Sequence, residues 1–194
     1  MKRLDLVIGP NGAGKSTFIA LTLAPLLRGI VIVNADEIAR RQWPADAAAH
    51  SYEAARIAAA TRSALISAGR SFIAETVFPH PSKLELFDGA HASGYTVVVH
   101  VLLVPEGLAV ERVAHRVRAG GHDVPEVKVR ERHRRLWPLV VAAVERADLA
   151  TVYDNSRLAG PRTAARLAAG AIIGSPDWPT WAPQPLEARW PRGG

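Results

Sequence analysis

The chain has 194 residues, of which 48% are hydrophobic and 22% are charged, and its formal net charge is +6. This length suits one α/β domain, 1–194, with a substantial core, and the composition excludes an intrinsically disordered chain. The absence of cysteine excludes disulfides and thiolate metal sites, and no apolar run reaches the roughly 20 residues that cross a bilayer. Because no secretory signal is visible either, we expect a cytoplasmic protein without a membrane partner.

Short apolar runs alternate with longer amphipathic patterns up to Asp154. The apolar runs predict five strands, at 3–8, 30–33, 71–74, 95–104 and 150–153. The segments between them predict helices at 15–27, 46–68, 82–92, 106–119 and 125–146. Continuous apolar strands separated by helices are typical of a parallel sheet that helices cover on both faces. The sequence therefore predicts an α/β fold with a five-stranded, mostly parallel sheet flanked by helices.

Three local features add to this prediction. Ser82 and Glu85 form a capping box at the start of one helix. Residues 162–173 could form a hairpin around Gly170. The Trp/Pro-rich tail, 174–194, is irregular, and we expect it to pack onto the body of the domain.

Residues 9–16, Gly-Pro-Asn-Gly-Ala-Gly-Lys-Ser, match G-x-x-x-x-G-K-[ST] between a predicted strand and a predicted helix. Glycines let backbone N–H groups turn inward around anionic oxygens, and the helix N-terminus adds its positive end. Lys15 supplies a charge for the β- and γ-phosphates, and the Ser16 hydroxyl is a hard ligand for Mg²⁺. The motif predicts a P-loop NTPase that binds ATP or GTP with Mg²⁺. The expected nucleotide contacts are Gly9, Asn11, Gly12, Ala13, Gly14, Lys15, Ser16 and Thr17.

Acidic residues follow three of the predicted strands, where ligands bind in open α/β sheets. Asp36 is our candidate for the base that accepts the hydroxyl proton of the phosphoryl acceptor, although it could instead cap the next helix. Glu75, assisted by Thr76, could order a magnesium-bound water or bind the acceptor, or could simply pair with an arginine. The turn that begins at Asp154 is either structural or a polar edge against adenine, which Asn155 would contact.

Basic residues are concentrated in one segment, since eight basic and only three acidic residues lie between Arg112 and Arg135. The segment could be a solvated helix face, a nucleic-acid patch or a clamp on a polyphosphate.

The helical pair at about 107–146 interrupts the alternation of strands and helices. In nucleotide kinases such an insertion is often a lid that brings arginines onto the phosphates. The glycine pair at 120–121 is a plausible hinge for this arginine-rich lid. We select Arg116 and Arg132 as the residues that clamp the γ-phosphate.

Five motifs follow one another along the chain. They are Gly-Pro-Asn-Gly-Ala-Gly-Lys-Ser-Thr, Val-Asn-Ala-Asp-Glu-Ile-Ala, Ala-Glu-Thr-Val-Phe, Gly-Gly-His-Asp-Val-Pro and Asp-Asn-Ser. Together they resemble the short branch of the zeta-toxin family of P-loop kinases. The resemblance implies a fold related to nucleoside-monophosphate kinases and to the chloramphenicol phosphotransferase. In well-known members the acceptor is the 3′-hydroxyl of the amino sugar in UDP-N-acetylglucosamine.

The resemblance also implies roles and partners. By matching position, Lys15 and Ser16 would hold the phosphates and Mg²⁺, Asp36 would be the base, and Glu75 and Thr76 would touch the acceptor. An antitoxin-like inhibitor protein would be a possible partner. The chain is short for a toxin of this family, with little room for a large sugar-nucleotide pocket.

We therefore predict an ATP-dependent kinase that transfers the γ-phosphoryl group to a hydroxyl of a small molecule, with a UDP-N-acetylamino sugar as the first candidate. A small-molecule or nucleoside kinase outside toxin–antitoxin systems would use the same residues. A polynucleotide 5′-kinase is a weaker alternative, because only Trp137 interleaves the basic run, and we do not expect a nucleic-acid partner. An ABC-type ATPase is disfavoured, because no Leu-Ser-Gly-Gly-Gln-like signature is present.

Overall fold

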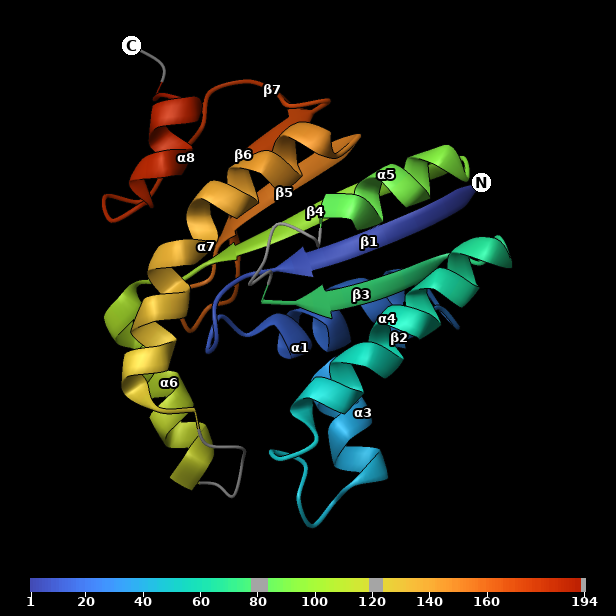
Figure 1. The fold of residues 1–194 in the computed structure, drawn as a ribbon. Helices are drawn as coiled ribbons and strands as arrows, with labels where there is room; N and C mark the ends of the chain where they lie inside the picture. The colour runs from blue at the N-terminus through green and yellow to red at the C-terminus, as the bar shows by residue number, and fades with distance from the viewer. Residues whose placement is uncertain (78–83, 119–123, 193–194) are drawn as a thin grey trace.

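A computed structural model describes residues 1–77, 84–118 and 124–192 of the chain (Figure 1). The strands are β1 (Lys2–Ile8), β2 (Val31–Val33), β3 (Phe72–Thr76), β4 (Tyr95–Leu103), β5 (Leu149–Asp154), β6 (Arg162–Ala168) and β7 (Ala171–Ile172). The helices are α1 (Lys15–Phe18), the π-helical η1 (Ile19–Leu23), α2 (Ala24–Leu26), α3 (Ala35–Gln42), α4 (Ser51–Ser67), α5 (Glu85–Ala92), α6 (Glu106–Arg118), α7 (Glu126–Arg146) and α8 (Gln184–Arg189).

The strands form one sheet in the order β2-β3-β1-β4-β5-β6-β7. Neighbouring strands from β2 to β5 pair in parallel, whereas β6 and β7 pair antiparallel at one edge. The predicted α/β fold with a mostly parallel sheet is confirmed. The predicted number of five strands is wrong, because the hairpin considered at 162–173 adds two strands to the sheet.

The helix predicted from Lys15 is continuous to Leu26 but widens into a π-helix in the middle. Pro25 has no N–H to donate to the preceding turn, and the wide π turn lies directly before it. Two expected features, Ser82 of the capping box and the glycine pair at 120–121, lie outside the described residues.

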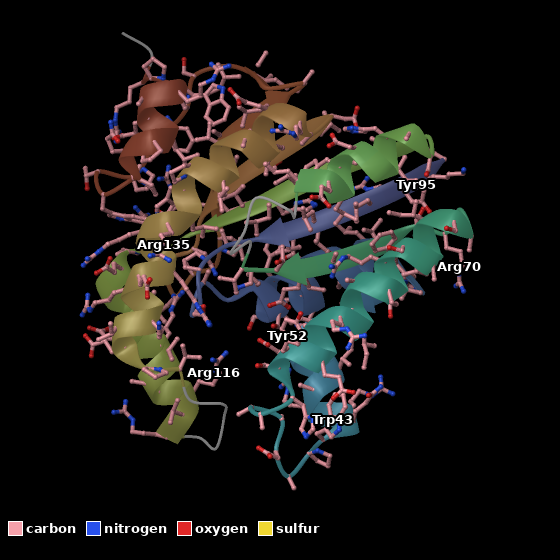
Figure 2. The ribbon with its side chains drawn as sticks, in the orientation of Figure 1. Trp43, Tyr52, Arg70, Tyr95, Arg116 and Arg135 are labelled. Atoms are coloured by element: carbon pink, nitrogen blue, oxygen red, sulfur yellow. The ribbon has the colours of Figure 1, made fainter. Side chains whose placement is uncertain are left out.

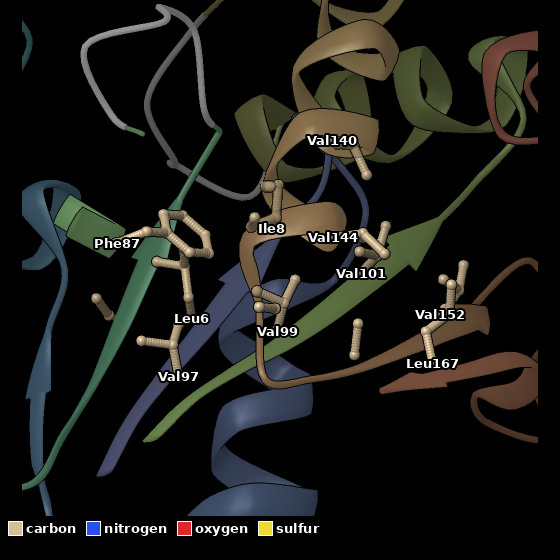
Figure 3. Close-up of a cluster of buried hydrophobic side chains, with 14 of the residues drawn as sticks. Leu6, Ile8, Phe87, Val97, Val99, Val101, Val140, Val144, Val152 and Leu167 are labelled. Carbon is tan, nitrogen blue, oxygen red and sulfur yellow. The ribbon is translucent and has the colours of Figure 1, made fainter. Parts of the chain in front are cut away.

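Helices cover both faces of the sheet at its centre. On one face, Leu6, Ile8, Val99 and Val101 from β1 and β4 pack with Phe87 of α5 and with Val140 and Val144 of α7 (Figure 3). On the other face, Val7, Ile73 and Leu102 pack with Phe18 and Ile19 of the helix that follows β1, and with Val113 of α6. The parallel strands are therefore packed between helices on both faces.

The C-terminal tail is tied to the body by its tryptophans. The indole N–H of Trp178 donates to the Trp190 carbonyl at 2.9 Å, and that of Trp190 donates to the Gly170 carbonyl at 2.9 Å. Arg192 donates to the carbonyls of Trp178 and Pro179 at 2.7 and 2.9 Å. The tail is thus held against the β6–β7 hairpin.

Candidate active site

The loop between β1 and α1 has a backbone conformation that favours glycine at two positions. Gly12 and Gly14 have φ values of 77° and 81°, in the left-handed region. A Cβ on Gly12 would lie 2.4 Å from the carbonyl oxygen of Ala109, and one on Gly14 would lie 2.8 Å from the Asn155 amide nitrogen. Positive φ values and close packing together shape the loop as a nest of backbone amides, which suits anionic oxygens.

The Lys15 side chain is buried and folds back over this loop. Its Nζ donates to the carbonyl oxygens of Gly9 and Pro10, each at 3.0 Å. Among the residues that the structure describes, no carboxylate forms an ion pair with Lys15. The loop therefore contains a buried ammonium group whose charge is balanced only at longer range.

The electrostatic surroundings of Lys15 identify the groups that share its site. Burial lowers the pKa of the Lys15 ammonium group, while the negative charges of Glu75 and Asp36 raise it and the positive charge of Arg116 lowers it. The overall pKa is below the ordinary value for lysine. A triphosphate fits this site, because it would supply the missing negative charge next to amides that favour anions.

Three strand ends meet beside the loop. In the register of the sheet, Glu75 of β3 lies next to Val7 of β1, and Val33 of β2 lies next to Ala74. The Ser16 hydroxyl donates to the two carboxylate oxygens of Glu75 at 2.9 and 3.1 Å. The Asn34 side-chain amide donates to Glu75 at 2.6 Å.

Hard oxygen ligands for Mg²⁺ are thus adjacent in the Ser16 hydroxyl and the Glu75 carboxylate. Within the described parts of the chain, no group of three or more His, Cys, Asp or Glu residues could hold a metal ion alone. This donor set fits an ion that is shared with phosphate oxygens, as Mg²⁺ usually is.

Asp36 lies in the first turn of α3 and does not cap it. The cap is Asn34, whose Oδ1 accepts from the backbone N–H groups of Asp36 and Glu37 at 2.8 and 3.2 Å. The alternative in which Asp36 caps this helix is therefore wrong, because the Asn34 side chain already accepts from these N–H groups. The Asp36 side chain is exposed, and no hydrogen bond from the described residues occupies its carboxylate.

Asn155 lies beneath the phosphate loop. Its Nδ2 donates to the Ala13 carbonyl at 2.7 Å, and its own carbonyl accepts from Arg112 Nη1 at 3.0 Å. Arg112 also reaches the Gly12 carbonyl at 3.5 Å. Asn155 therefore stabilises the phosphate loop through its hydrogen bond to Ala13, and its contact with adenine stays a prediction.

The remaining predicted contacts surround the loop. Thr76 ends β3 beside Ile8 of β1, and Thr17 is exposed on α1. The side-chain oxygen of Asn11 is buried and has no hydrogen-bond partner in the part of the chain that the structure describes. A buried acceptor without a donor costs free energy.

The lid arginines fall into two groups. Arg130 and Arg134 both pair with Glu106, at 2.8 and 3.1 Å, and their hydrogen bonds lower the pKa of that carboxyl. Arg116 and Arg132 are exposed and form no ion pair with any residue in the described ranges. Figure 2 shows Arg116 on the side of α6 that faces α3 and α4, and its charge acts on Lys15. Among the described residues, Arg132 has no such effect on the pKa of Lys15.

Sequence reasoning missed Asn34 and Arg112 as parts of the site. Asn34 precedes the first turn of α3 and is a favoured cap residue, so its capping role had a local signal. Its bond to Glu75 and the bonds of Arg112 had none, because both join residues that are distant in the sequence.

A mostly parallel sheet, a glycine-rich loop with a buried lysine, and carboxylates at the adjoining strand ends together define a P-loop fold with a candidate nucleotide site. Over the residues that the structure describes, no helix is long and apolar enough to cross a membrane. Residues 2–159 match the family model described as Zeta toxin, and the chain belongs to this family. The resemblance noted in the sequence is confirmed.

Solved structures share the fold at low sequence identity. The AvrRxo1-ORF1:-ORF2 complex superposes with a TM-score of 0.68 at 14% identity, over 89% of this chain and 60% of that chain. A chain of the PezAT chromosomal toxin–antitoxin system of Streptococcus pneumoniae gives 0.66 at 14% identity, over 97% and 84%. Shikimate kinase from Acinetobacter baumannii gives 0.52 at 19% identity, over 80% and 84%. These identities show the fold alone, and the chain spans 60% of the length of the AvrRxo1 chain. A comparison with curated proteins found no match.

Proposed function

We propose that this protein is an ATP-dependent kinase that moves the γ-phosphoryl group of ATP onto a hydroxyl of a small molecule. One observation carries the proposal. The buried Lys15 ammonium group in the phosphate loop interacts electrostatically with Glu75 and Asp36, two carboxylates from neighbouring strand ends. A site with one cation for phosphate, one oxygen pair for metal and one accessible carboxylate has the parts that phosphoryl transfer needs.

Each residue then has a role in the reaction. The loop amides and Lys15 bind the β- and γ-phosphates, and Ser16 with Glu75 would hold Mg²⁺, which would supply positive charge to the phosphate oxygens. Asp36 orients the acceptor hydroxyl and accepts its proton. The acceptor oxygen forms a bond to the γ-phosphorus while the bond from that phosphorus to the β–γ bridging oxygen breaks, and ADP leaves with the electron pair. The products are the phosphorylated acceptor, ADP and one proton.

Arg116 is the better-supported lid arginine in this proposal, because its charge already acts at Lys15. Arg132 stays a prediction. Val113 of α6 and Val129, Leu136 and Val140 of α7 are buried in the core, and movement of the lid, about 107–146, stays a prediction.

The acceptor and the partner are proposed from the family. A UDP-N-acetylamino sugar is the first candidate acceptor, and a kinase outside toxin–antitoxin systems would present the same site. A structural relative comes from a toxin–antitoxin system, and another was solved with ATP, which supports an inhibitor protein as partner and ATP as donor. We also propose a cytoplasmic location.

Incubation with γ-labelled ATP, Mg²⁺ and a panel of UDP-sugars, amino sugars, nucleosides and 5′-hydroxyl oligonucleotides tests the proposal. We expect label in one acceptor class. Asp36→Asn should keep the affinity for ATP within a few-fold while phosphoryl transfer falls by about 10³-fold.

Glu37→Gln is the matched control, because Glu37 lies in the same helical turn and pairs with Arg40. It should keep the rate within about three-fold, as expected for an exposed ion pair. Full activity of Asp36→Asn would remove Asp36 as the base. Absence of both transfer and ATP hydrolysis in well-folded protein would remove the kinase proposal.

A further inference from the structure

We propose that Asn34 is a positioning residue for phosphoryl transfer, which fixes Asp36 relative to the Ser16–Glu75 pair. This inference rests on the proposed kinase function and assigns a role to a residue that would not itself touch the reacting atoms.

The two ends of the Asn34 side chain bind two different parts of the site. Its Oδ1 accepts from the backbone N–H groups of Asp36 and Glu37 and so fixes the first turn of α3. Its Nδ2 donates to Glu75 at 2.6 Å, and Glu75 accepts from Ser16. One amide group therefore links the helix that carries Asp36 to the residues that would hold the metal.

The hydrogen-bond partners determine the orientation of this amide. Oδ1 faces two donors and Nδ2 faces a carboxylate, so a flipped amide would place donor against donor and acceptor against acceptor. Aspartate could still cap the helix but would repel Glu75. Serine could cap the helix but is too short to reach Glu75 as well. Both bonds together require a side chain with one acceptor and one donor at this length.

Helix α3 packs on one side through Ala39, which is buried, and through Ala35 and Ile38, which are partly buried against the core. The exposed side of its first turn carries Asp36 and is tied to Glu75 by the bonds of Asn34. A displacement of about 1 Å in a catalytic group can cost about 10²-fold in rate.

The test compares Asn34→Ser, which keeps the helix cap, with Asn34→Ala, which loses both bonds. For Asn34→Ser we expect a melting temperature close to that of the wild type, an unchanged KM for ATP, and a kcat that is lower by about 10²-fold. For Asn34→Ala we expect the same loss of kcat together with a lower melting temperature. Rates are normalised to the ATP-binding fraction measured by calorimetry.

The outcomes distinguish a failure of the Asn34 inference from a failure of the proposed kinase function. If Asn34→Ser recovers the wild-type kcat, Asn34 acts only as a helix cap and the inference is wrong while the kinase function stands. If the wild type itself transfers no phosphate from ATP, the proposed function fails and this inference fails with it. A loss of kcat in Asn34→Ser at unchanged stability and KM supports the positioning role.

Discussion

Two buried charged groups, Asp5 within β1 and Lys15 at the start of α1, have partners of different kinds. Asp5 in the middle of β1 is fully buried and accepts from Arg3 at 2.7 Å and from His100 at 2.9 Å. Burial raises the pKa of Asp5, but the hydrogen bonds from His100 and Arg3 outweigh it, so the pKa lies below its ordinary value. Lys15 is also buried, yet its two bonds go to uncharged carbonyls and its pKa is lowered.

The difference separates a charge that is paired inside the protein from the charge that we propose binds phosphate. The Asp5 carboxylate is bonded to two basic side chains, Arg3 and His100, although Nδ1 of His100 is buried without a hydrogen-bond partner among the described residues. The Lys15 site has two carboxylates only at longer range, beside a loop shaped for anions. Perturbed ionisable groups of this second kind are typical of functional sites. The following predictions test the contrast.

Replacing Lys15 with methionine should abolish function without harming the fold. We expect the affinity for ATP·Mg to fall by about 10³-fold, because the point charge for the phosphates is lost. The unliganded protein should be as stable as the wild type or more stable, since methionine avoids the cost of burying an ammonium group. Titration calorimetry and urea unfolding measure the two effects. Wild-type heat of ATP binding would contradict the assignment of the loop.

Replacing Asp5 with asparagine should have the opposite pattern. Removal of one partner from a buried ion pair costs about 3 kcal/mol of unfolding free energy, whereas the affinity for ATP should stay within two-fold. Urea unfolding at pH 7 measures the loss. A large loss of ATP affinity in folded Asp5→Asn would show that the two clusters are not independent.

The loss of unfolding free energy in Asp5→Asn should also depend on pH, with a definite sign. Because the folded-state pKa of Asp5 is lowered, its contribution to stability is present above the unfolded-state pKa of about 3.9 and is lost as the pH falls through the folded-state pKa. The difference in unfolding free energy between wild type and Asp5→Asn should therefore be constant near neutral pH and shrink in acid. A difference that does not change down to pH 2 would be inconsistent with the charge of Asp5.

The two clusters were not equally visible in the sequence, and the reason is the range of their contacts. The place of the loop at 9–16 between a strand and a helix could be predicted, because the motif, the strand and the helix are contiguous in the sequence. The Asp5 cluster was not predicted, because Asp5 and His100 are 95 residues apart. The bond between Asn34 and Glu75 spans 41 residues, and that between Arg112 and Asn155 spans 43. No local pattern encodes such pairs.

The fold shows the same limit. Continuous apolar runs predicted the parallel strands, but they carry no information on their order in the sheet. The edge hairpin was left open, because β6 includes the polar residues Arg162, Thr163 and Arg166 and β7 has only two residues. Arg130 and Arg134 are four residues apart on α7, and both bond to Glu106. The spacing of the two arginines could not show which acidic residue would pair with them.

Two arginines of the lid differ in the same way, and they offer the most closely matched pair of variants. Arg134 forms an ion pair with Glu106. Arg116 has no ion pair among the described residues, and its positive charge lowers the pKa of Lys15. Arg116→Ala should lower kcat by about 10²-fold, somewhat less than the effect of a fully engaged arginine finger, with the KM for ATP nearly unchanged. Arg134→Ala should change kcat by no more than about three-fold, because an exposed ion pair contributes little. Steady-state kinetics at physiological salt measures both. Equal losses in the two variants would mean that the lid acts through its total charge, and a larger loss for Arg134→Ala would reverse the assignment.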